Sequence, residues 1–91
     1  MSLAKARRIA REKGIAGKIS NSTRKGKRLM IERPDGKIIH FGSATGQTFI
    51  DHGDKDKRKA WRARHREIMR GGKPAYKDRD SPSFYAWKIL W

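Results

Sequence analysis

The chain has 91 residues, with 24 Lys and Arg against 9 Asp and Glu, which gives a formal net charge of +15. A chain of this length forms one small domain with a thin core, and the absence of Cys excludes a disulfide framework and a Cys-based zinc site. No apolar run approaches the roughly 20 residues of a membrane span, and the first residues lack the apolar stretch of a signal peptide. We therefore expect a soluble protein, without membrane insertion, whose partner is acidic.

The charge is distributed unevenly along the chain. Residues 1–28 carry ten Lys and Arg against one acid, and residues 55–70 carry eight against two. Between these two basic blocks, residues 29–54 carry two Lys and Arg against four acids and hold many of the large apolar side chains. The core is therefore expected to come from the middle of the chain and from its apolar C-terminus.

The first 28 residues are expected to form a basic N-terminal helix and arm, ahead of a small α+β domain over residues 29–91. Ser2 is a suitable N-cap, and apolar residues follow at helical spacing until Gly14, which is suited to end the helix. The next stretch, Gly17 to Gly26, is polar and basic and has no periodicity. It is predicted to be a linker or a flexible arm.

A β-hairpin is predicted over residues 29–41, because two apolar stretches flank the sequence Pro34-Asp35-Gly36. Proline presets φ at the second position of a turn, aspartate favours turns, and glycine tolerates a positive φ. Residues 48–50 are predicted to form a short third strand. The sheet is thus expected to be antiparallel with two or three strands.

A second helix is predicted over residues 55–70, with Asp54 as its N-cap. Trp61, His65 and Ile68 follow the spacing i, i+4, i+7 and so share one face, which is expected to pack on the hairpin. The remaining positions are mostly Lys and Arg. This helix is therefore expected to present a narrow apolar stripe inwards and a broad cationic surface to solvent.

A short C-terminal helix is predicted over residues 83–90, where Ser81 provides an N-cap and Pro82 the first helical position. It is expected to close the core by docking the apolar end of the chain. The aromatic residues that are expected in the core are Phe41, Phe49, Trp61, Trp87 and Trp91.

Several short motifs carry a family resemblance. In chain order they are Ser22-Thr23-Arg24-Lys25-Gly26-Lys27-Arg28, Asp35-Gly36-Lys37, His40-Phe41-Gly42, Asp51-His52-Gly53-Asp54, Lys57-Arg58, Trp61, Arg64-His65, Ser81-Pro82 and Ile89-Leu90-Trp91. Their order resembles a family of small basic proteins of large double-stranded DNA viruses, of the phycodnavirus and mimivirus kind. The resemblance covers roughly residues 20–91. It implies a virion-associated protein, found in the virion and the infected host cell, and it implies no established activity.

The basic blocks favour binding to nucleic acid, most simply double-stranded DNA, through phosphate contacts and largely without sequence preference. Each neutralised phosphate releases condensed counterions, and arginine can hold phosphate oxygens in a bidentate way. In particular, Arg58 and Arg62 lie one helical turn apart and are suited to clamp neighbouring phosphates. The predicted nucleic-acid-binding residues are Arg24, Lys25, Lys27, Arg28, Lys57, Arg58, Arg62 and Arg66.

Two other functions remain open at this stage. A minor capsid protein, binding other capsid subunits, would also use a basic arm and an apolar C-terminus. A metal-dependent nuclease would use His40 and His65, with Asp51, His52 and Asp54 as further ligands or a general base. Capping and turn roles explain the two acids more simply, so no enzyme activity, metal site or cofactor is expected.

Overall fold

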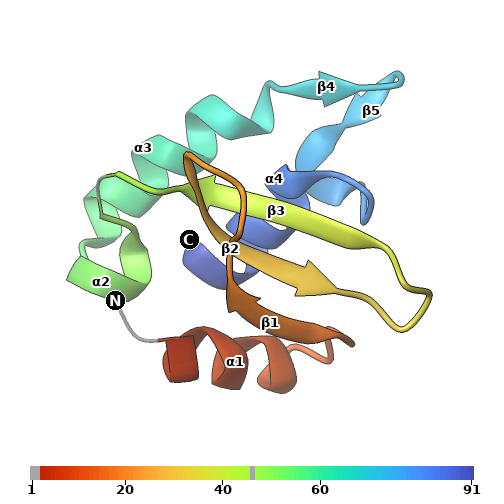
Figure 1. Cartoon of the computed structure of the whole chain (residues 1–91). Coiled ribbons are helices and arrows are strands. Elements are labelled where there is room, and N and C mark those ends of the chain that lie inside the picture. The colour runs from red at the N-terminus through yellow and green to blue at the C-terminus, as the bar shows by residue number, and fades with distance from the viewer. Residues whose placement is uncertain (1–2, 46) are drawn as a thin grey trace.

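A computed structural model describes residues 3–45 and 47–91 and shows an α+β fold, as the sequence predicts (Figure 1). An N-terminal helix precedes a three-stranded antiparallel sheet, and further helices end in a short C-terminal one. The expected N-cap, Ser2, lies outside the described residues. Within the described part of the chain, no helix has the length and apolarity that crossing a membrane requires.

The elements follow one another closely. The helices are α1 (Leu3–Glu12), α2 (Phe49–His52), α3 (Lys55–Arg66) and α4 (Pro82–Tyr85), with a 3₁₀ turn at Ala75–Lys77 and a π-helical segment, η2, at Ala86–Leu90 that continues α4. The strands are β1 (Lys18–Asn21), β2 (Lys27–Glu32), β3 (Ile38–Ser43), β4 (Met69–Arg70) and β5 (Lys73–Pro74).

The predicted hairpin is confirmed as β2 and β3. Leu29 pairs with Phe41 and Ile31 with Ile39, so alternate residues of both strands point into the core. Gly36 has φ +86° at the predicted turn, a conformation that glycine adopts without a Cβ penalty.

The third strand lies elsewhere than predicted. The expected linker contains β1, which pairs with the free edge of β2 in the order β1-β2-β3. Ile19 is 2% exposed and faces Ile31, so one well-placed apolar side chain and a row of backbone hydrogen bonds suffice to form the strand. Sequence periodicity cannot show this, because the segment has too few apolar residues to alternate.

Residues 48–50, predicted as a strand, instead provide the N-cap, Thr48, and the first two residues of the one-turn helix α2. The Asp51 carboxylate accepts hydrogen bonds from the Thr48 backbone N–H at 2.7 Å and from its hydroxyl at 3.0 Å. This Thr-x-x-Asp arrangement favours the start of a helix over an extended strand. Gly53, at φ +66°, then ends the turn.

Asp54 caps α3 as predicted, because its side chain accepts from the backbone N–H groups of residues 56 and 57 at 3.0 and 3.2 Å. The helix ends at Arg66 rather than at residue 70, because the residues that follow pair as the small hairpin β4–β5. Ile68 therefore leaves the helix face and is 45% exposed. Trp61 and His65 do share that face, and their rings stack at 3.8 Å.

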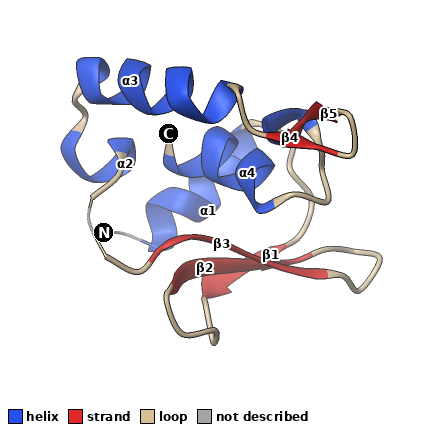
Figure 2. Cartoon of the chain, turned by 90° about the horizontal axis from the view of Figure 1, so that it is seen from above, coloured by secondary structure: helices blue, strands red, loops and turns tan. Residues whose placement is uncertain are grey.

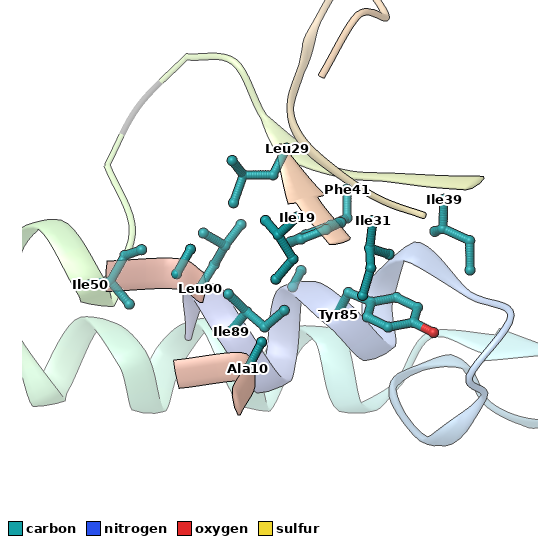
Figure 3. Packing of buried hydrophobic residues seen from close by; sticks show 12 residues of the cluster. Ala10, Ile19, Leu29, Ile31, Ile39, Phe41, Ile50, Tyr85, Ile89 and Leu90 are labelled. Carbon is teal, nitrogen blue, oxygen red and sulfur yellow. The ribbon is translucent and has the colours of Figure 1, made fainter. Parts of the chain in front are cut away.

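The core lies between the sheet and the C-terminal helix (Figure 3). Its largest fully buried side chains come from β2, β3 and η2: Leu29, Ile31, Phe41, Ile89 and Leu90. Ala6 and Ala10 of α1 and Ile19 of β1 join the same cluster, so residues on both sides of the expected boundary at residue 28 contribute to one core.

Only one of the five aromatic residues expected in the core is fully buried. Phe41 is 0% exposed, whereas Phe49, Trp61, Trp87 and Trp91 are half-buried. These four lie at the border of the core, because α3 packs against the C-terminal helix through stacked rings rather than through a second apolar core. Trp61 and Trp91, for example, stack at 5.0 Å.

Candidate nucleic-acid interface

Helix α3 carries the densest charge in the molecule. Seven of its twelve residues are Lys or Arg, and only Asp56 is acidic. Figure 2 shows α3 on one side of the molecule and the three-stranded sheet on the other, with the C-terminal helix between them. Its exposed basic residues, named here the α3 basic face, are Lys55, Lys57, Lys59, Arg64 and Arg66.

The cations of the α3 basic face form no ion pair with a carboxylate of the described residues. Among the described residues, the ion pairs join side chains of α1, of the sheet and its turns, of α2 and of residues 70–80. None of them includes a residue of α3. The face is therefore available to an external anion at every one of its five positions.

Arg58 and Arg62, the predicted phosphate clamp, point instead towards the aromatic border. The Arg58 guanidinium lies 4.2 Å from the centre of the Phe49 ring. The Arg62 guanidinium donates from Nη2 to the Trp91 carbonyl at 3.0 Å and lies 5.1 Å from the centre of the Trp87 ring. Burial lowers the pKa of Arg62, and the charge of Arg58 lowers it further.

Arg28 is held inside the protein. Its side chain is 9% exposed and forms an ion pair with Asp51 at 2.6 Å, and its Nη1 donates to the Thr48 hydroxyl at 2.9 Å. Burial by itself raises the pKa of the Asp51 carboxyl, but the hydrogen bonds from Arg28 and Thr48 outweigh it and lower that pKa to about 2. Arg28 thus fastens α2 to β2 in this structure.

The other predicted residues of the first basic block are exposed. Arg24 and Lys25 lie in the loop between β1 and β2, and Lys27 begins β2. This loop projects from the sheet on the side away from α3 (Figure 2). The eight predicted residues therefore do not form one surface: Lys57 and Arg66 lie on the α3 basic face and these three lie elsewhere.

Two lysines near Arg62, Lys13 and Lys88, were not among the predicted binding residues. The Lys13 ammonium, just after α1, donates to the Lys88 carbonyl of η2. Burial lowers the pKa of Lys13, and the positive charges of Arg62 and Lys88 lower it further. No pattern in the sequence could reveal this cluster, because its members are far apart along the chain and are brought together only by packing.

The residues of the alternative metal site have other partners. His40 Nδ1 lies 2.7 Å from the Ser22 hydroxyl, and His65 Nδ1 lies 2.9 Å from the Trp61 carbonyl. His52 Nδ1 accepts from the Asp54 backbone N–H at 2.9 Å. Over the described residues, no three His, Asp or Glu side chains come together in a group suited to hold a metal ion.

The comparisons with known proteins give one match. The profile of a protein family described as a family of unknown function (DUF5754) covers residues 17–65, which is more than half of the chain. The matched region runs from β1 through most of α3 and so includes the sheet, α2 and much of the α3 basic face. Neither the curated proteins nor the solved structures contain a match.

Proposed function

The chain belongs to the DUF5754 family, and because that family has no known function, we propose one from the residues of this chain: it binds nucleic acid through phosphate contacts, without catalysis. The observation that carries the proposal is the α3 basic face, whose five cations form no ion pair with a carboxylate among the described residues. A polyanion is the ligand that such a face favours most.

Double-stranded DNA suits this surface because its phosphates form closely spaced rows. A straight helix that exposes cations along its length can meet several phosphates at once, and each contact releases counterions. Direct reading of bases would need side chains aimed into a groove. On α3, Ala60 and Ala63 also face solvent between the cations and carry no hydrogen-bonding group. Binding is therefore largely independent of sequence.

The setting that we propose is a large double-stranded DNA virus, with the protein in the virion and in the infected cell. Its support is the resemblance of the motifs between Ser22 and Trp91, together with a charge of +15 that suits a packaged genome. A second role, binding to capsid subunits, is favoured by one observation. Ile68 and Met69, adjacent in sequence, are 45% and 58% exposed and offer an apolar contact beside α3.

Binding of a short labelled DNA duplex over about 50 to 200 mM salt tests the proposal. The variant Lys57→Gln/Lys59→Gln/Arg66→Gln removes three charges from the α3 basic face, and none of these three side chains forms an ion pair among the described residues. Three lost phosphate contacts should reduce the slope of log K against log salt by about 2.7 and weaken binding at least tenfold near 150 mM salt.

The matched control is Arg24→Gln/Lys25→Gln/Lys27→Gln, which removes the same charge from residues outside the α3 basic face. It should weaken binding clearly less than the α3 variant. Equal losses in the two variants would show a response to net charge alone and would remove α3 as the site. Cleavage of the duplex in the presence of Mg²⁺ would contradict a role without catalysis.

A further inference from the structure

A second cationic region lies in a cleft between the end of α1, the turn between β2 and β3, and the C-terminal helix. Its volume is about 900 Å³, within the range of sites that take small organic ligands. Its wall includes Lys13, Arg62, Arg79, Phe84, Trp87 and Lys88. None of them belongs to the α3 basic face.

The cleft is lined by more positive than negative side chains. Lys13, Arg62 and Lys88 come close enough for their charges to repel, since the latter two lower the pKa of Lys13. Asp35 also lines the cleft, but it is paired with Arg33 at 2.9 Å. An anion placed among the three cations would relieve their repulsion and gain charge-assisted hydrogen bonds.

Aromatic rings form the neighbouring wall of the same cleft. Phe84 is half-buried, and the Lys88 ammonium lies 5.8 Å from the centre of its ring. Trp87 stacks on Tyr76 at 4.1 Å, which holds the indole in place. Tyr76 and the Arg62 guanidinium already lie against the Trp87 ring. A flat ring attached to an anion would therefore rest against Phe84 while the anion meets the cations.

We propose that this cleft binds a nucleotide, with its phosphate held by Lys13 and Lys88 and its base against the aromatic wall. The same chemistry occurs in a free nucleotide and at the phosphorylated 5′ end of a single strand. The inference does not depend on the proposed function, because the α3 basic face and the cleft use different residues.

Isothermal titration of the full chain with AMP, with inorganic phosphate, and with a short single strand with or without a 5′-phosphate tests the site. AMP should bind at least about tenfold more tightly than inorganic phosphate, through the added ring contacts. The variant Lys13→Gln/Lys88→Gln should weaken AMP binding at least tenfold. A single strand should bind at this site only through a 5′-phosphate. Removing that phosphate should therefore abolish the part of the single strand's affinity that depends on Lys88.

Two controls separate this site from the rest of the molecule. Arg79→Gln/Lys88→Gln changes only exposed side chains, so it tests the cleft even where loss of Lys13 disturbs the fold, and it too should weaken AMP binding. The α3 variant Lys57→Gln/Lys59→Gln/Arg66→Gln should leave AMP binding unchanged. Absence of AMP binding, equal affinity for AMP and phosphate, or unchanged affinity in both cleft variants would each overturn the proposal.

Discussion

At the scale of the residue, basic side chains of similar sequence context have opposite roles. Arg28 ends a run of exposed basic residues, yet its side chain is buried against Asp51. Lys57 and Arg66, on α3, remain exposed without an ion pair among the described residues. The difference lies in the partner: a buried ion pair fixes a guanidinium, whereas an unpaired exposed cation remains available to a ligand.

The Arg28–Asp51 pair leads to a prediction about pH. The pKa of Asp51 is about 2 in the folded protein and 3.8 in its ordinary state, so its contribution to stability is complete above about pH 4 and is lost as the pH falls through 2. Between pH 5 and pH 2 the free energy of unfolding should therefore fall by about 2 kcal/mol more in the native protein than in Asp51→Asn.

Urea denaturation at a series of pH values measures this difference. Acid also increases the repulsion among the many cations, but that effect is nearly the same in the native protein and the variant. Parallel pH curves for the two proteins would show that the pair contributes nothing specific. At pH 7 the variant itself should be less stable, because Arg28 would be left buried beside an uncharged group.

At the scale of the element, close packing fixes the position of β1. Gly17, just before the strand, has φ +135°, and a Cβ built there would lie 2.8 Å from Ile31 Cγ1 and 2.9 Å from the Glu32 carbonyl oxygen. The backbone of Gly17 thus lies directly against β2. This contact orients β1 along the edge of the sheet.

Gly17→Ala should therefore lower the free energy of unfolding by about 2 kcal/mol or more, through both overpacking and the positive φ. Gly36→Ala is the matched control, because it has φ +86° but nothing within 4 Å of the added methyl group. It should cost only about 1 kcal/mol of backbone strain. Equal losses in urea denaturation of the two variants would mean that β1 does not depend on this close approach.

At the scale of the whole molecule, α1 is part of the fold as well as a source of charge. Ala6 and Ala10 are 0% and 4% exposed, and the Lys5 ammonium donates to the Ile50 carbonyl at 2.9 Å. The Arg7 guanidinium donates to the Ile19 carbonyl at 2.8 Å. These contacts join the N-terminal helix to β1 and α2.

Deletion of residues 1–16 should therefore lower the midpoint of thermal unfolding by roughly 10 °C or more, because the core would lose the helix α1 that packs against it. The control Arg8→Gln/Arg11→Gln removes two exposed charges from the same helix and should leave the midpoint nearly unchanged. Circular dichroism measures both. An unchanged midpoint after the deletion would show that the helix is an appendage.

Local signals in the sequence predicted a good part of the fold. Pro34-Asp35-Gly36 specified the turn of the hairpin, and Asp54 and Ser81 specified the starts of two helices, because turns and caps depend on a few neighbouring residues. The same signals did not reveal β1, since a strand with one apolar residue depends on the edge that receives it.

The residues of the candidate sites were likewise predictable from the sequence only in part. The sequence by itself determined that the protein is strongly basic, that Lys57 and Arg66 belong to a cationic helix and that the middle of the chain forms a hairpin, because composition and local periodicity are properties of the chain alone. Only the tertiary structure decided that Arg28 is buried. It also decided that Lys13 and Lys88 meet beside Arg62, since burial and long-range contacts arise when segments far apart in the chain pack together.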